Sequence, residues 1–152
     1  MSLKIGDIVP NFTAKNSHGE VFESQNFLGR KPLVIYFYPK DNTPGCTTEA
    51  CSFRDQYEDF AALGAEVIGI SADSVKSHHK FANKHKLPFI LLSDQDKRLR
   101  QLFGVKNNLF GLLPGRVTFI IDRNGVVIYI FDSMNAAKHI PKALDIIKEL
   151  VL

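Results

Sequence analysis

Short apolar runs alternate with helical patterns along this chain, and this alternation constrains the fold more than any other feature. Four runs rich in β-branched and aromatic residues are typical of strands buried on both faces: PLVIYFY at 32–38, EVIGISA at 66–72, PFILLSD at 88–94 and RVTFIID at 116–122. Helical patterns occupy 47–63, 74–85, 97–103 and 136–150. A strand followed by a helix, repeated, indicates parallel crossover connections. The sequence therefore predicts an α/β fold.

Two predicted hairpins extend this sheet. RNGVVIYIF, at 123–131, follows the last run through an Asn-Gly pair, which is a strong signal of a tight β-hairpin. Near the N-terminus, NFTAKN at 11–16 and EVFES at 20–24 are joined by a short turn. We expect a central mixed sheet flanked by helices, with an N-terminal β-hairpin extension. A length of 152 residues is usual for one domain, so we expect a single domain over 1–152.

Composition argues against several classes of protein. Hydrophobic residues make up 45% and charged residues 23% of the chain, and no apolar run is long enough to span a bilayer. The net charge is only +3 with scattered basic residues, so no nucleic-acid partner is expected. The tightest basic cluster, Asp96 to Arg100, is interpreted as a solvated helix face. The start MSLKIGDIVPNF has no apolar signal core, which predicts a cytoplasmic protein; a plastid protein after transit-peptide removal is the alternative.

The only two cysteines lie in one segment, PKDNTPGCTTEAC at 39–51. In a reducing cytosol such a pair is more often catalytic or metal-binding than a permanent disulfide. Cys46 is predicted in the first turn of a helix, where unpaired backbone N–H groups stabilise a thiolate. Gly45 lets a small reactant approach the backbone, and the Thr43 hydroxyl can donate to a thiolate. These features single out Cys46 as the reactive thiol.

Several interpretations of the cysteine pair can be compared. If one helix runs through Cys46 and Cys51, their Cα atoms lie roughly 8 to 9 Å apart. That exceeds the ~7 Å limit for a disulfide, so a permanent bond conflicts with the helical pattern. Zinc would need four ligands, and the five histidines are dispersed with none near the cysteines in sequence, so no metal is expected. A thioredoxin-like reductase would have two residues between its cysteines, and here there are four. Two interpretations remain: the cysteines are two buried core thiols, or they are a working pair that forms and breaks a disulfide. His78 and His79, adjacent on a predicted helix, are expected to be exposed.

The motif P-x-x-x-T-x-x-C, from Pro39 through Thr43 to Cys46, resembles the active-site signature of the peroxiredoxins. The second cysteine, Cys51, is similar to that of the peroxiredoxin Q or bacterioferritin comigratory protein branch. The resemblance extends from GDIVPNFT through LVIYFYPKDNTPGCTTEAC to LPGRVTFIIDRNGVV, and the last stretch resembles the cyanobacterial and plastid form. It implies a thioredoxin-like fold and makes Arg116 the active-site arginine.

The resemblance also implies an activity, that of a thioredoxin-dependent thiol peroxidase acting on hydrogen peroxide and organic hydroperoxides. The Cys46 thiolate would become a sulfenic acid, and Cys51 would condense with it to a disulfide that thioredoxin reduces. Arg116 would stabilise the developing negative charge while Thr43 orients the peroxide. Glu49 would hold the guanidinium in place, or it is simply a solvated carboxylate at the helix start. The branch implies a monomer that needs no cofactor or metal.

A different class of function stays open at this point. A thiol redox sensor, or a chaperone-type binding protein, could use the same disulfide switch to signal rather than to turn over. Sustained consumption of excess peroxide would separate the enzyme from the sensor. The apolar stretch Leu109, Phe110, Leu112 and Leu113 favours some use of alkyl hydroperoxides.

Overall fold

A seven-stranded mixed sheet forms the centre of the fold. Its strands are β1 (Thr13–Asn16), β2 (Val21–Glu23), β3 (Leu33–Phe37), β4 (Glu66–Ser71), β5 (Ile90–Ser93), β8 (Val117–Ile121) and β9 (Val127–Asp132). They are ordered β2-β1-β5-β4-β3-β8-β9, with β3 and β4, and β4 and β5, parallel and the other neighbours antiparallel. A separate pair joins β6 (Asn107–Asn108) to β7 (Leu113–Pro114).

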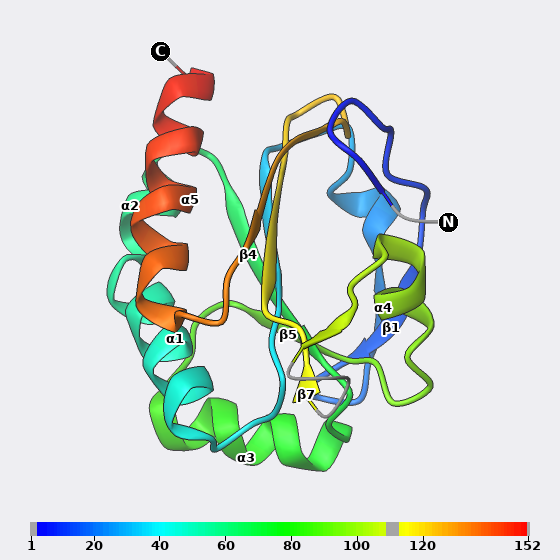
Figure 1. Cartoon of the computed structure of the whole chain (residues 1–152), viewed down its shortest axis with the longest axis vertical. Coiled ribbons are helices and arrows are strands. Elements are labelled where there is room, and N and C mark those ends of the chain that lie inside the picture. Colours follow the sequence, from blue (N-terminus) through cyan, green and yellow to red (C-terminus); the bar gives the residue numbers. More distant parts are fainter. Residues whose placement is uncertain (1–2, 109–112, 152) are drawn as a thin grey trace.

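Helices cover both faces of this sheet. The computed structural model describes residues 3–108 and 113–151, with the side chains of 107–108, 113–114 and 151 excepted. Its helices are η1 (Ser24–Asn26), α1 (Pro44–Asp55), α2 (Tyr57–Ala62), α3 (Val75–His85), α4 (Arg98–Phe103) and α5 (Ala136–Val151). Figure 1 shows α1, α2 and α5 on one side of the sheet, and α4 with the N-terminal segment on the other.

The central strand β3 divides the core into two clusters, because alternate side chains point to opposite faces of a strand. Val34 and Tyr36 belong to the cluster that includes residues of α1, α2, α3 and α5. Leu33, Ile35 and Phe37 belong to the cluster that includes residues of α4 and the N-terminal segment. With both faces covered, every residue of β3 is buried, which explains why its sequence is a continuous apolar run.

The predicted α/β architecture is confirmed, with its mixed sheet and N-terminal hairpin. One predicted helix differs: the pattern at 47–63 forms two helices, α1 and α2, separated at Gln56, whose backbone is not helical (φ −100°, ψ 3°). The first helix also begins earlier than predicted, at Pro44, because proline is well suited to the first helical position. Both cysteines therefore lie in a single short helix, which is the condition for the Cα separation expected above.

Two predictions of exposure are wrong. His78 is 0% exposed, because its side chain lies between α3 and the sheet and its Nε2 donates to the Leu92 carbonyl at 3.0 Å. Arg100, in the cluster interpreted as a solvated helix face, is only 5% exposed. Its guanidinium lies over the Phe37 ring and donates to the Tyr38 carbonyl at 3.4 Å. Helical periodicity does not distinguish a long polar side chain that folds inward from one that stays in water.

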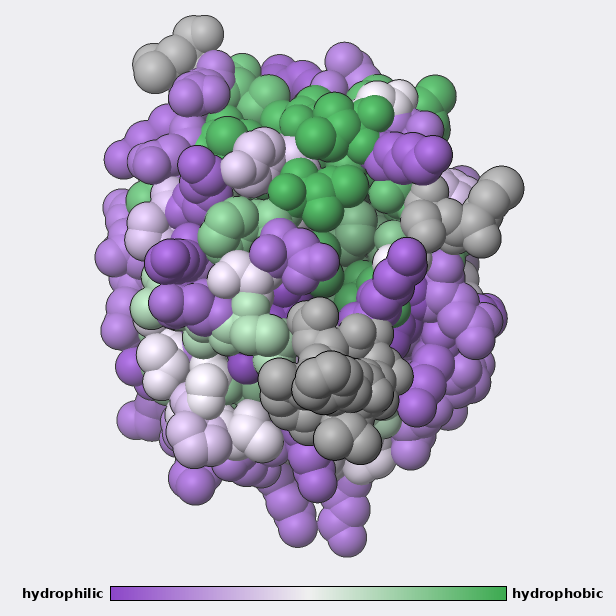
Figure 2. All heavy atoms as spheres, in the orientation of Figure 1, coloured by the Kyte–Doolittle hydropathy of each residue, from purple (hydrophilic) through white to green (hydrophobic). Residues whose placement is uncertain are grey.

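The surface is uneven in polarity. In Figure 2 the apolar side chains of the visible face gather in its upper part, where Figure 1 places the β8–β9 turn and the N-terminal segment. Exposed apolar residues of that segment include Ile5 and Ile8. Among the described residues, no helix has both the length and the apolar character needed to cross a membrane.

Candidate active site

Cys46 lies where the central strand β3 passes into α1. The strand ends at Phe37, a short loop follows, and Thr43 takes the N-cap position with an extended backbone (φ −84°, ψ 151°). Cys46 is therefore in the first turn of α1, as the sequence predicts. Its side chain is 1% exposed and carries a free thiol. Unpaired N–H groups at a helix start favour negative charge at this place.

Arg116 reaches Cys46 from the neighbouring strand. Since β3 and β8 are antiparallel and Phe37 pairs with Val117, the residue before β8 lies beside the loop that leaves β3. The Nη2 atom of Arg116 donates to Cys46 Sγ at 3.3 Å. A Cβ atom at position 45 would lie 3.1 Å from that same nitrogen, so Gly45 leaves the space that the guanidinium occupies. The arrangement places a fixed cation against the thiol.

Glu49 holds the other side of the guanidinium. Its Oε1 accepts from Arg116 Nη1 at 2.6 Å, and both side chains are buried. The contact excludes the alternative that Glu49 is a solvated carboxylate at the helix start. Burial raises the pKa of Glu49, and the attraction of Arg116 opposes that shift. Burial disfavours charge on Arg116 as well, but Glu49 and Cys46 more than offset it, so its pKa is raised and it stays cationic.

His139, on α5, closes the polar cluster, and the sequence alone did not single it out. Its Nδ1 lies 2.7 Å from the Thr118 hydroxyl and 3.6 Å from Glu49 Oε2, and its Nε2 lies 2.6 Å from the Ser133 carbonyl. Burial lowers the pKa of His139 to about 4. The neutral ring donates from Nε2 to Ser133 and accepts from Thr118 at Nδ1. The sequence feature that could have indicated His139 is its position on the buried face of α5, next to the buried Ile140.

Thr43 and Pro39 lie in the loop before Cys46. The Thr43 hydroxyl donates to the Lys40 carbonyl at 2.8 Å, so it is turned into the loop rather than hydrogen-bonded to the cysteine. Both side chains are half-buried. The structure thus brings Cys46, Arg116 and Glu49 together and leaves Thr43 close in sequence without a direct bond to the thiol. The apolar residues Leu109, Phe110 and Leu112 lie outside the described residues, as does the side chain of Leu113.

Cys51 has different neighbours although it shares α1 with Cys46. Its thiol is free and its side chain is half-buried. Its Sγ atom lies 3.7 Å from Nδ1 of His85, at the C-terminal end of α3. Sequence positions alone put the histidines far from the cysteines, whereas the fold brings this one into contact. Cys46 and Cys51 therefore have separate surroundings in the thiol form.

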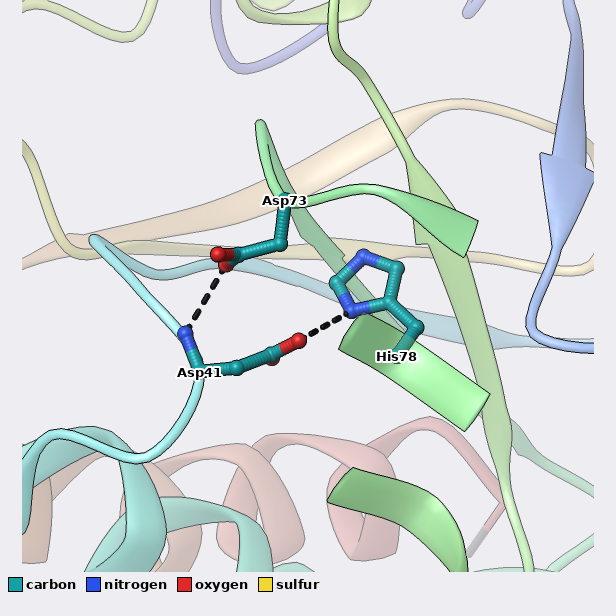
Figure 3. Close-up of side chains that lie close together, drawn as sticks. All are labelled: Asp41, Asp73 and His78. Atoms are coloured by element: carbon teal, nitrogen blue, oxygen red, sulfur yellow. Dashed lines mark hydrogen bonds and ion pairs between the residues drawn. The ribbon is translucent and has the colours of Figure 1, made fainter. Parts of the chain in front are cut away.

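A second buried cluster anchors the loop before Cys46 to α3 (Figure 3). Asp41 accepts from Tyr38 through Oδ1 at 2.6 Å and lies 2.7 Å from His78 Nδ1 through Oδ2. Its backbone N–H donates to Asp73 Oδ2 at 2.8 Å. Among the described residues, Asp41, Asp73 and His78 are the group whose ligand atoms could surround a metal ion. Each of these side chains already has hydrogen-bond partners within the protein, so the geometry indicates a structural anchor.

A buried thiol at a helix start, in contact with an arginine and set on a mixed α/β sheet, defines an enzyme that uses a cysteine thiolate as its nucleophile. Residues 5–130 match the AhpC/TSA family. Peroxiredoxin Q, chloroplastic, from Triticum aestivum is 51% identical over 146 residues, which cover 95% of this chain and 67% of the wheat protein. The chain belongs to the AhpC/TSA family of peroxiredoxins, in its peroxiredoxin Q branch, and is a thiol peroxidase with two cysteines, Cys46 and Cys51.

Solved structures agree with this assignment and confirm the predicted thioredoxin-like fold. Peroxidoxin BcpB from Mycobacterium tuberculosis superposes with a TM-score of 0.87 at 38% identity, covering 97% of this chain and 98% of that one. The bacterioferritin comigratory protein of Xanthomonas campestris superposes with a TM-score of 0.87 at 34% identity, covering 99% of this chain and 98% of that one. The branch that the cysteine spacing suggested is therefore confirmed.

Proposed function

We propose that Cys46 is the thiol that attacks peroxide and that Cys51 then joins it in an intramolecular disulfide. The observation that carries the proposal is the 3.3 Å contact between Arg116 Nη2 and Cys46 Sγ at the start of α1. A permanent positive charge and the N-terminus of a helix both favour the thiolate, which is the nucleophilic form of cysteine. The proposed active site lies within one domain that spans 1–152.

The first step oxidises Cys46 by two electrons. Its Sγ attacks one peroxide oxygen, the O–O bond breaks, and the other oxygen leaves as hydroxide or alkoxide and takes up a proton. Arg116 faces the sulfur and stabilises the developing negative charge, while the Cys46 N–H and the Thr43 hydroxyl orient the peroxide. Glu49 keeps the guanidinium in place by its 2.6 Å bond. Gly45 and Pro39 shape the loop that admits the peroxide.

The second step forms the disulfide and needs α1 to open. Both cysteines lie in this helix, where five residues of separation place their Cα atoms roughly 8 to 9 Å apart. The Cys51 sulfur attacks the Cys46 sulfenic acid, the S–O bond breaks, and water leaves. An external dithiol, for which thioredoxin is our candidate, then takes the oxidising equivalents and restores both thiols.

The substrate range, assembly and compartment are part of the same proposal. Alkyl peroxide reduction is an activity of the bacterioferritin comigratory protein of Xanthomonas campestris, which supports use of organic hydroperoxides beside hydrogen peroxide here. We propose a monomer without nucleic-acid or membrane partners. We propose a cytoplasmic location; the wheat relative is named as chloroplastic, so a plastid is the alternative.

Peroxide-dependent NADPH oxidation through thioredoxin and its reductase tests the cycle. Wild-type protein should consume many equivalents of hydrogen peroxide, and Cys46→Ser none. Consumption that stops after one equivalent with fresh thioredoxin present would contradict the proposed recycling and would favour a redox sensor. Sedimentation of the reduced and oxidised protein tests the monomer.

A further inference from the structure

The resolving cysteine has a polar partner that the proposed cycle leaves without a role. Cys51 Sγ lies 3.7 Å from the Nδ1 atom of His85, which is within the range of a hydrogen bond to sulfur. His85 is the last residue of α3, and its side chain is half-buried against α1. The contact joins residues far apart in the sequence, so it results from the packing of α3 against α1.

His85 is in the neutral form that can accept a proton. Burial, together with the positive charges of Lys84 and Arg54, lowers the pKa of His85. The imidazole is therefore neutral at neutral pH, and Nδ1, which faces the sulfur, can accept a proton. The ring also lies edge-on to Phe81 with centroids 5.1 Å apart, which limits its rotation.

Charged groups from both helices surround this contact. Arg54 of α1 donates through Nη1 to the His85 carbonyl at 2.8 Å, and Asp55 fixes the same guanidinium through Nε at 3.0 Å. From α3, Lys84 contributes a further positive charge near the ring. Cys51 thus has one neutral base in contact with its sulfur, and Arg54 of its own helix is bound to the backbone of that base.

We propose that His85 is the general base of the resolving step, an inference that rests on the proposed roles of Cys46 and Cys51. Its Nδ1 takes the proton from the Cys51 thiol, and the thiolate attacks the Cys46 sulfenic sulfur. The S–O bond breaks, and the departing hydroxide is protonated to water. The S–S bond forms without a further oxidant, because the peroxide has already withdrawn two electrons. A thiolate attacks far faster than a thiol, so the base acts on the rate of disulfide formation.

A purely structural role for His85 predicts the opposite sign. If the contact only held α1 in its helical form, its removal would ease the opening of α1, and the disulfide would form faster. If His85 is a base, its removal slows disulfide formation and makes it more dependent on pH. The direction of the change therefore separates the two roles.

The test follows His85→Gln by rapid quenching with an alkylating reagent and mass spectrometry after one equivalent of hydrogen peroxide. Formation of the Cys46 sulfenic acid should keep its wild-type rate. Disulfide formation should slow by roughly a hundredfold or more at pH 7, the size expected for the loss of a general base. The difference from wild type should shrink as the pH rises, since hydroxide can then deprotonate the thiol.

Two controls keep the result interpretable. His79→Gln removes an exposed histidine of the same helix, whose Nδ1 lies near the Ser17 carbonyl at 3.2 Å, and should leave both steps unchanged. In His85→Ala, added imidazole should restore part of the lost rate. An unchanged or faster disulfide step in His85→Gln, with a wild-type pH profile, would overturn the role of His85 while leaving the cycle intact. Wild-type protein that forms no Cys46 sulfenic acid, or no disulfide to Cys51, would overturn the cycle itself.

Discussion

The surroundings of the two cysteines differ although both lie in α1. Cys46 is buried and faces the cation of Arg116, which is bound to Glu49, and the neutral His139 lies 3.6 Å from that carboxylate. Cys51 is half-buried and faces a histidine whose charge depends on pH. In the proposed cycle the fixed charge of Arg116 acts on Cys46 throughout. The titratable His85 acts on Cys51 only in the step in which the thiol loses its proton.

Removing each thiol in turn is the strongest test of the difference between Cys46 and Cys51. Cys46→Ser should abolish peroxide consumption, because Arg116 contacts Cys46 and the remaining thiol, Cys51, faces His85 instead. Cys51→Ser should still reduce one equivalent and then stop at the sulfenic acid. The measurement is the stoichiometry of peroxide consumed, with dimedone labelling of the stalled product. If Cys46→Ser kept a peroxide-reactive thiol and Cys51→Ser lost it, the two assignments would have to be exchanged.

Arg116→Met should produce the next largest effect. The loss of a preorganised donor at developing charge slows a reaction by roughly a hundredfold to a thousandfold. We therefore expect the second-order rate constant with hydrogen peroxide to fall by this order while the oxidised sulfur, once formed, is still resolved by Cys51. The matched control is Arg98→Met, an exposed arginine at the start of α4. An unchanged rate constant in Arg116→Met would remove this residue from the chemistry.

The buried His139 predicts how stability depends on pH. Its pKa is about 4 in the fold and 6.5 ordinarily, so the unfolded chain binds more protons between these values. The free energy of unfolding should therefore fall as the pH drops from 6.5 to 4, by about 3 kcal/mol at 1.36 kcal/mol per pH unit. Urea unfolding at several pH values measures this.

His139→Gln should remove that share of the acid sensitivity, because glutamine does not titrate. The control is His18→Gln, whose side chain is exposed. A slope against pH that is the same in His139→Gln and wild type would mean that another group causes the acid instability.

The smallest energetic effect concerns the helix that the two cysteines share. Oxidation should remove protection from hydrogen exchange at the amides of Thr48 to Arg54, because the disulfide demands a Cα separation below ~7 Å. Thr47 and Thr48 are poor helix formers near the first turn, which lowers the cost of opening. The amides of β3 and β4 should keep their protection as an internal control. Equal protection in both redox states would point to a disulfide between two molecules.

The parts of the fold that follow from local pattern were predictable from sequence. The buried strands are continuous apolar runs because both faces of the sheet are covered, and the Asn-Gly pair marks the β8–β9 hairpin. The break at Gln56 was not predictable, since the apolar pattern continues across it into Phe60. The spacing of apolar residues shows which face of a helix is buried. A break of one residue between two helices leaves the same face of both helices buried, so the spacing does not reveal the break.

The site was predictable only in part, because most of its contacts join distant positions. Cys46 could be placed at a helix start from Pro44 and Gly45 alone. Arg116 was reached through the family resemblance, since its approach to Cys46 depends on how β3 pairs with β8. Nothing in the local sequence indicated that His85 meets Cys51, or that His78 is buried against Asp41. Such contacts are set by packing between elements.

The break at Gln56 also limits how much of the chain has to refold after each proposed turnover. With α1 ending at Asp55 and α2 starting at Tyr57, the opening that the disulfide requires can stay within one helix of twelve residues. Helices of about twenty residues relax in roughly a microsecond or less. Encounter with a reductant in solution is far slower at cellular concentrations, so rebuilding the helix costs no time in the cycle. In the proposed cycle the opened, disulfide-bonded form is therefore the longest-lived oxidised form, and it is the form that a reductant would have to recognise.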